Sequence, residues 1–161
     1  GKHDINNRSI GIELVNPGHR YGYKKFTKGQ VSSLISLLKR VMKRHKIPKN
    51  RILGHSDVAP QRKMDPGELF DWNYLAERNI GVWPKDQYPK SKKNHTTKSM
   101  QLILAGIGYE INTSGKLDRQ TKKVVSAFQR HFRPKKINGL FDHETVAKLL
   151  ALSSQKLYRS T

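Results

Sequence analysis

Cysteine is absent from the 161-residue chain. Disulfide bonds, thiolate nucleophiles and thiolate zinc sites are therefore excluded, and any metal ion must be bound by His, Asp or Glu. The sequence also has no apolar run near the ~20 residues that a membrane-spanning helix requires. We therefore expect neither thiol chemistry nor a transmembrane segment.

Acidic residues are scarce, because 12 Asp and Glu stand against 32 Lys and Arg, for a formal net charge of +20. A field of this sign attracts polyanions and accelerates their association. Nucleic acids and an anionic cell wall both fit such a field, and a solvated lysine-rich surface without either partner gives the same composition. The charge alone leaves these interpretations open.

Several common catalytic signatures are also missing from the chain. It contains no HExxH motif, no GxSxG motif and no Walker-type phosphate loop. Six histidines lie in polar or charged stretches: His3, His19, His45, His95, His131 and His143. We expect each of them to be a surface residue rather than a metal ligand. Any chemistry must therefore come from another group of residues.

The first part of the chain has the pattern of an α/β unit. Residues 9–15, Ser-Ile-Gly-Ile-Glu-Leu-Val, form a short apolar run typical of a buried strand, and residues 51–55 resemble a second one. Between them, Thr27 and Gln30 have the spacing of a capping box, and apolar residues then recur at helical spacing. A helix between two strands predicts a parallel strand pair within a mixed sheet flanked by helices. Residues 68–79 predict one further helix.

The chain divides at a lysine- and proline-rich stretch over residues 85–97, which we interpret as a linker. Residues 1–84 then form the first domain. Residues 98–153 form the second, for which the apolar spacing predicts a small three-helix bundle. Residues 154–161 are a basic tail.

A polar segment after the second predicted strand carries most of the candidate residues. Residues 54–67 read Gly-His-Ser-Asp-Val-Ala-Pro-Gln-Arg-Lys-Met-Asp-Pro-Gly. His55 and Asp65 offer the nitrogen and oxygen ligands that zinc accepts, and the loop is long enough to bring them onto one ion. Pro60 and Pro66 would stiffen it. The spacing is equally typical of a structural hydrogen-bonded pair, so it does not decide between the two.

Glu13 is the only charged residue within the first predicted strand. In an alternating strand its side chain points away from Ile12 and Leu14. It could then serve as a general base beside a metal-bound water, or it could simply face solvent at the edge of a sheet. The pattern alone leaves both roles open.

These two segments together resemble the core of the type 2 N-acetylmuramoyl-L-alanine amidases, the AmpD and AmiD family related to peptidoglycan recognition proteins. The resemblance covers about residues 5–84, and the segment at 54–67 is its most specific part. It implies zinc-dependent hydrolysis of the amide bond between N-acetylmuramic acid and L-alanine, in peptidoglycan or its fragments.

The resemblance also implies a role for each candidate residue. In that family a zinc ion is bound by two His and one acidic residue. His55 matches the second His ligand and Asp65 the carboxylate ligand. Glu13 matches the residue that activates water, and Lys63 the residue that stabilises the oxyanion. Arg62 lies where family members can contact the peptide stem.

The sequence departs from the family at its beginning. The family's first His ligand lies upstream of the Ser-Ile-Gly-Ile-Glu segment, where only eight residues stand here, and His3 is too close to Glu13 to replace it. The family's first strands and first helix are missing too. We therefore expect a C-terminal portion of the amidase domain with an incomplete zinc site, to be filled by water, by another His or by a separate N-terminal fragment.

Residues 98–153 resemble the peptidoglycan-binding domain that is often attached to such hydrolases. This resemblance implies binding of glycan or stem peptide, which would raise the local substrate concentration as a tether does. It also favours the cell envelope, periplasm or outer membrane, over the cytoplasm. A stabilising appendage without a ligand is the alternative. The resemblance is carried by Met100-Gln101-Leu102, Leu104, Gly108-Tyr109, Gly115 to Asp118, Thr121, Val125, Phe128-Gln129, Asn138-Gly139, Thr145 and Leu149.

Two rival functions remain from the sequence. One is a non-catalytic peptidoglycan-binding fragment, because the first His ligand is absent. The other is a nucleic-acid binder, because a basic cluster between residues 39 and 51 would suit phosphates. That cluster has no interleaved aromatic residues and no known motif, which argues against nucleic acid.

Overall fold

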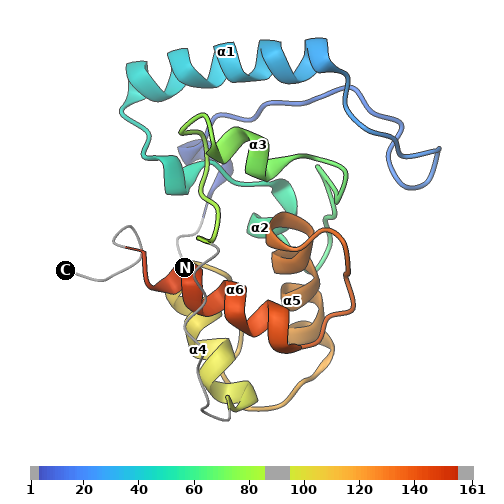
Figure 1. The fold of residues 1–161 in the computed structure, drawn as a ribbon, viewed down its shortest axis with the longest axis vertical. Coiled ribbons are helices and arrows are strands. Elements are labelled where there is room, and N and C mark those ends of the chain that lie inside the picture. The colour runs from blue at the N-terminus through green and yellow to red at the C-terminus, as the bar shows by residue number, and fades with distance from the viewer. Residues whose placement is uncertain (1–3, 86–94, 156–161) are drawn as a thin grey trace.

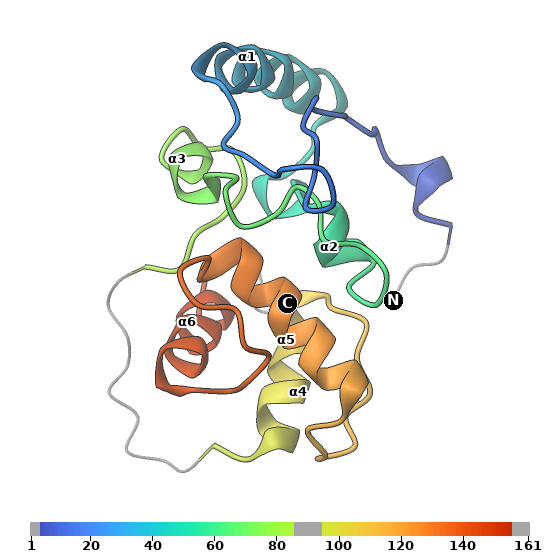
Figure 2. The ribbon, with the colours of Figure 1, turned by 90° about the vertical axis from the view of Figure 1, so that its right-hand side faces the viewer.

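The computed structural model describes residues 4–85 and 95–155. Within these ranges the regular elements are α-helices and short 3₁₀ helices, without a single strand. Figures 1 and 2 show α1 at one end of the molecule and the helices α4, α5 and α6 at the other, with α2 and α3 between them. No helix in the described ranges is both long and apolar enough to span a membrane.

The longest helix is α1 (Lys28–His45), and it begins at the predicted capping box. The Thr27 hydroxyl accepts a hydrogen bond from the Gln30 amide at 3.2 Å, and the Gln30 side chain accepts one from the Thr27 amide at 2.9 Å. Leu34 and Leu38 are buried on its inner face. They pack in a first core with four buried residues of the segment that follows: Phe70, Trp72, Leu75 and Ile80.

Short elements follow α1: η2 (Lys49–Arg51), α2 (His55–Val58) and α3 (Trp72–Ala76), while η1 (Asn6–Arg8) precedes it. The helix expected over residues 68–79 is therefore only five residues long. Asp71 explains its late start, because its carboxylate accepts a hydrogen bond from the Tyr74 amide at 2.9 Å and fixes the N-cap there.

The α/β prediction is wrong for the described residues. Residues 9–15 do alternate as expected, since Ile12 and Leu14 are partly buried and Glu13 is exposed. Their backbone, however, forms no backbone hydrogen bond to any described residue. The second expected strand is also missing: η2 ends at Arg51 and α2 begins at His55, and residues 52–54 between them have no regular secondary structure. Apolar periodicity reports which side chains are buried, whereas a strand also needs a neighbour to pair with.

The three helices predicted after the linker are present as α4 (Thr97–Ile107), α5 (Arg119–Phe132) and α6 (His143–Ser153). The N-cap residues of the three helices are Thr96, Asp118 and Asp142. The side chain of each accepts a hydrogen bond from the backbone amide three residues later. Their second core includes Met100, Leu104, Val124, Val125, Phe128, Leu149 and Leu152. Val82 belongs to this core as well, so the chain before the predicted linker is packed onto the bundle. The domain boundaries proposed from the sequence stay a prediction.

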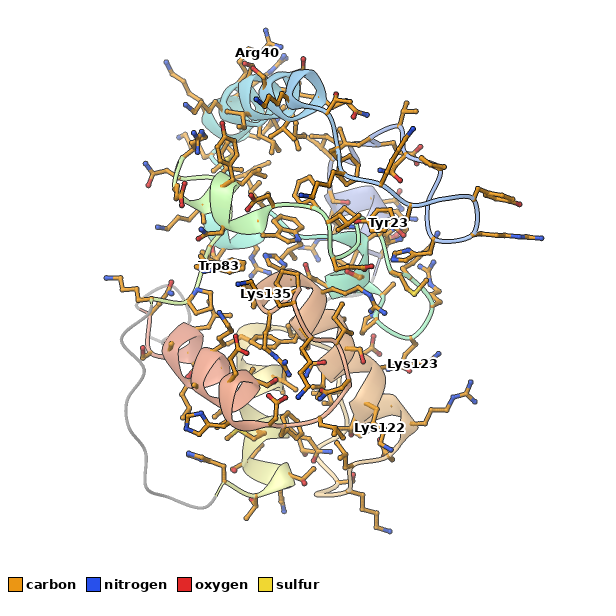
Figure 3. All side chains as sticks on the ribbon, turned by 45° about the vertical axis from the view of Figure 1, so that its right-hand side comes forward. Tyr23, Arg40, Trp83, Lys122, Lys123 and Lys135 are labelled. Carbon is orange, nitrogen blue, oxygen red and sulfur yellow. The ribbon has the colours of Figure 1, made fainter. Side chains whose placement is uncertain are left out.

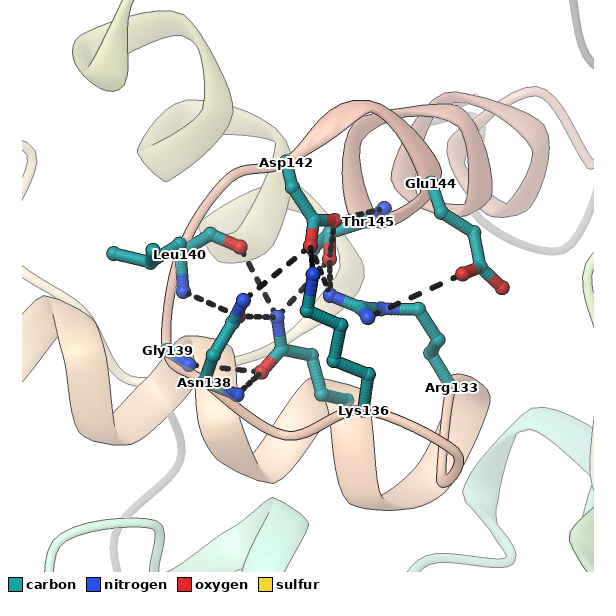
Figure 4. A network of polar contacts seen from close by, with 9 residues as sticks. Arg133, Lys136, Asn138, Gly139, Leu140, Asp142, Glu144 and Thr145 are labelled. Carbon is teal, nitrogen blue, oxygen red and sulfur yellow. Dashed lines mark hydrogen bonds and ion pairs between the residues drawn. The ribbon is translucent and has the colours of Figure 1, made fainter.

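A polar network fixes the turn between α5 and α6 (Figure 4). Buried Gln129 accepts hydrogen bonds from the Asn138 and Gly139 amides at 2.8 and 2.9 Å, and donates one to the Thr145 hydroxyl at 3.0 Å. Buried Arg133 donates to the Asp142 carboxylate at 2.6 Å. These contacts tie the N-terminus of α6 to the side of α5.

Gly139 is required by this turn, so Gly139→Ala should destabilise the protein by about 1–3 kcal/mol. Its φ is +69°, and a Cβ there would lie 2.9 Å from the Lys122 carbonyl oxygen. Chemical denaturation measures the change. Gly106→Ala in α4 is the matched control, because its Cβ meets nothing within 4 Å, and helix propensity predicts a gain of about 0.5–1 kcal/mol. Equal effects of the two substitutions would contradict this account.

Candidate functional site

The candidate site lies on the loop of residues 54–67. Gly54 is the N-cap of α2, and its amide donates a hydrogen bond to the Asp57 carboxylate at 2.8 Å. This single helical turn buries Ser56 and Asp57 and leaves His55 exposed. The Ser56 amide then donates to the Asp65 carbonyl at 2.9 Å, which closes the two ends of the loop on each other.

This closure brings His55 and Asp65 together. Nδ1 of His55 lies 3.0 Å from Oδ2 of Asp65, and the two side chains are 44% and 59% exposed. In a tetrahedral zinc site, two such ligand atoms are about 3.4 Å apart. A small opening of the pair would therefore fit two ligand positions, and both groups are accessible from solvent.

Tyr23 braces the far end of the loop (Figure 3). Its hydroxyl donates to the Pro66 carbonyl at 2.7 Å and accepts from the Leu69 amide at 3.0 Å. A Cβ at Gly67 would collide with the Tyr23 ring, so this position needs glycine. Burial raises the pKa of the Tyr23 phenol above its ordinary value.

A second ionisable pair lies beside this brace. Nε2 of His19 is 3.0 Å from the Glu68 carboxylate, and the His19 ring stacks on Tyr23 with ring centroids 4.3 Å apart. Partial burial would raise the pKa of Glu68, but the hydrogen bond and charge of His19, together with Arg130, outweigh it and lower the pKa. The sequence reasoning missed this pair, because 49 residues separate its members and neither has a distinctive neighbourhood.

The remaining predicted residues lie as follows. Lys63 is half-buried on the loop, where its amide donates to the Ala59 carbonyl at 3.0 Å, and Arg62 beside it is exposed. Glu13 lines a separate groove with residues of α1, among them Gln30 and Ser33. Within residues 4–85 and 95–155, no three His, Asp or Glu side chains are placed so as to hold a metal ion. Glu13 therefore does not complete a metal-binding group with His55 and Asp65, and His3 lies outside the described residues.

One histidine was assigned wrongly from the sequence. His131, expected at the surface, is 2% exposed. A signal was present, because His131 follows Val124 and Phe128 at helical spacing and so lies on the buried stripe of α5.

Comparison with known families divides the chain into two matching parts. Residues 1–68 match the profile of the N-acetylmuramoyl-L-alanine amidase family, and residues 95–149 match that of a putative peptidoglycan-binding domain. The chain is 39% identical to the N-acetylmuramoyl-L-alanine amidase AmiD of Escherichia coli K12, over 92% of this chain and 58% of that protein. It is 44% identical to the 1,6-anhydro-N-acetylmuramyl-L-alanine amidase AmpD of Haemophilus influenzae, over 47% of this chain and 40% of that protein.

Solved structures agree with these matches. A complex of E. coli AmiD with the substrate anhydro-N-acetylmuramic acid-L-Ala-D-gamma-Glu-L-Lys is similar with a TM-score of 0.76 and 37% identity, over 86% of this chain and 56% of that one. AmpDH3 from Pseudomonas aeruginosa is similar with a TM-score of 0.78 and 28% identity, over 84% of this chain and 56% of that one. The chain thus spans little more than half the length of these relatives.

Zinc titration tests the His55–Asp65 pair directly. Because the described residues offer only this pair of candidate ligands, isothermal titration calorimetry should show weak zinc binding, at least about tenfold weaker in His55→Ala. His45→Ala is the control, since His45 is an exposed histidine at the end of α1. Tight binding that His55→Ala leaves unchanged would show that the pair is not the site.

Proposed function

We propose that this protein hydrolyses the amide bond between N-acetylmuramic acid and L-alanine. The proposal is supported by the match of residues 1–68 to the N-acetylmuramoyl-L-alanine amidase family and of residues 95–149 to a family of putative peptidoglycan-binding domains. Peptidoglycan or its soluble fragments would be the substrate. The observation that carries the proposal is the 3.0 Å approach of His55 to Asp65, on the loop whose sequence is the most family-specific.

We propose zinc as the cofactor, held by His55 and Asp65. When bound, zinc lowers the pKa of a coordinated water and polarises a substrate carbonyl. The donor set supports this assignment, because His55 and Asp65 offer a solvent-accessible imidazole and a carboxylate, and zinc readily accepts both. Harder cations such as Mg²⁺ and Ca²⁺ favour sites made of oxygen ligands alone. A third protein ligand is not found among the described residues. The comparisons give no support to a separate N-terminal fragment as its source.

The remaining roles belong to side chains of this chain. Lys63, half-buried two residues before Asp65, would stabilise the negative charge that develops on the amide oxygen. Arg62, exposed next to it, would bind a carboxylate of the peptide stem. Glu13, which the family resemblance matches to the residue that activates water, is an exposed carboxylate able to take a proton from the attacking water and pass it to the leaving amine. It lines the groove beside α1, so this role requires the substrate and water to reach from the loop to that groove.

We propose that the protein works at the bacterial cell envelope on an anionic wall. Residues 14–56 contain no acidic residue, and none of their Lys or Arg side chains forms an ion pair with any described residue. Figure 3 shows Arg40 at the outer side of α1, away from the bundle. All eleven of these basic residues are exposed, and we call them the basic face: Arg20, Lys24, Lys25, Lys28, Lys39, Arg40, Lys43, Arg44, Lys46, Lys49 and Arg51.

A non-catalytic peptidoglycan-binding function is the second candidate. The observation that favours it is the two-ligand metal pair, since a catalytic zinc site ordinarily has three protein ligands. The bundle and the basic face would suffice for attachment to the wall without any bond cleavage. Release of stem peptide separates this candidate from the hydrolase.

Incubation with insoluble peptidoglycan and zinc should release stem peptide, which mass spectrometry detects. Lys63→Met should lower kcat about 10²–10³-fold, because the charge that stabilises the transition state is lost, while retention on peptidoglycan stays unchanged. Lys49→Met removes an exposed cation of the basic face and should leave kcat unaltered. Retention of the unmodified protein without any release would favour the binding-only function.

Binding to the wall should weaken as salt rises, because exposed charges are screened. Replacing Lys39, Arg40, Lys43 and Arg44 by Gln should reduce both the retention on peptidoglycan at low salt and the slope of its salt dependence. The same variant should cleave a soluble muropeptide at the normal rate. Submicromolar binding to DNA with a steep salt dependence, lost in this variant, would instead indicate a nucleic-acid partner.

A further inference from the structure

Asp57, two residues after His55, is a buried carboxyl group that is shared between the two parts of the chain. It is 8% exposed. Its Oδ2 accepts from the Gly54 amide at 2.8 Å and from Nδ1 of His131 at 2.7 Å, and its Oδ1 accepts from the Tyr109 hydroxyl at 2.6 Å. One donor therefore comes from the loop itself, and two come from the helical bundle.

Both bundle donors are held rigidly. His131 is 2% exposed, and its ring stacks on Trp72 with centroids 3.9 Å apart and planes 15° from parallel. Tyr109 is 8% exposed and packs edge-on against Phe128 in the bundle core. A buried carboxyl group that loses one of its donors pays a desolvation penalty, so the loop is strongly favoured in the position where both bundle donors reach Asp57.

The bundle contacts the loop at a second point as well. The Gln61 side chain donates to the Gln120 carbonyl at 3.3 Å, and the Lys123 ammonium donates to the Gln61 carbonyl. Lys123 lies on α5, on the side that faces the loop (Figure 3). The loop is thus fixed to α5 beside its first ligand, His55, and again next to Arg62.

We propose that the helical bundle is a structural part of the catalytic site, in which Tyr109 and His131 act through Asp57 to position His55 opposite Asp65. This inference rests on the proposed function and deepens it. A bundle that is only a tether changes how much polymer is bound, whereas a bundle that positions the loop also changes catalysis on a small soluble fragment that needs no tether.

Tyr109→Phe and His131→Leu, made in the full chain, test this inference. Tyr109→Phe removes only a hydroxyl group, and His131→Leu removes a donor at similar volume. Both should weaken zinc binding in calorimetry about tenfold, the range found when a group supporting a metal ligand is lost. Both should lower kcat on a soluble muropeptide with KM and retention on peptidoglycan unchanged. In His131→Asn the side-chain amide can donate in place of Nδ1–H, so this variant should keep most of the zinc affinity and most of the kcat that His131→Leu loses.

Thr121→Val is the matched control. Thr121 is fully buried in the bundle and accepts from Gln101 at 2.9 Å, but it does not contact Asp57. Its substitution should lower the melting temperature while zinc affinity and kcat stay normal. If Tyr109→Phe and His131→Leu behave in the same way as Thr121→Val, their role is merely structural and the proposal is overturned.

Hydrogen exchange of the Ser56 amide in the zinc-free protein gives a readout that does not depend on activity. This amide closes the loop onto Asp65, so its exchange should be about tenfold faster in Tyr109→Phe and His131→Leu than in Thr121→Val. Unchanged exchange would overturn the positioning role. Faster exchange in a protein that neither binds zinc nor releases stem peptide would support the positioning role and overturn the proposed function.

Discussion

A carboxyl group removed from water must find hydrogen-bond donors inside the protein, and Asp57 finds them on both sides of one interface. Its three donors come from the loop that carries His55, from the chain after α4 and from α5. Trp72 closes the same interface by stacking on His131. The amidase-like part has a modest core of its own around α1 and α3, so this interface is what holds the candidate loop against a well-packed support.

The consequence is a site that depends on residues distant in sequence. His55 and Asp65 are exposed, and the distance between their side chains would vary if the loop made no contacts with the rest of the protein. The Asp57 contacts, the Gln61 contacts and the Tyr23 brace hold that loop at three points. A metal ligand functions only when it is held in the geometry that the metal requires. The residues that hold the loop in place therefore matter as much for metal binding as His55 and Asp65 themselves. The two family segments therefore form one structural unit around the loop.

Local features were predictable from the sequence. The capping box at Thr27 and the three helices of the bundle follow from patterns that operate within a few residues. The loop's capacity to bring His55 onto Asp65 also follows from its length and prolines. The expected sheet did not form in the described residues, because pairing depends on a neighbour that no local pattern specifies. Asp57 and His131 are 74 residues apart, and only tertiary packing brings them together.

A double-mutant cycle between Asp57 and Tyr109 tests the central claim most directly. The free energy of unfolding is measured for the unmodified chain, Asp57→Asn, Tyr109→Phe and the double variant. If the shared carboxyl group couples the loop to the bundle, the two single effects should fail to add by about 0.5–3 kcal/mol. Effects that add within about 0.3–0.5 kcal/mol, as for independent sites, would show that the two parts are merely adjacent and would contradict the account.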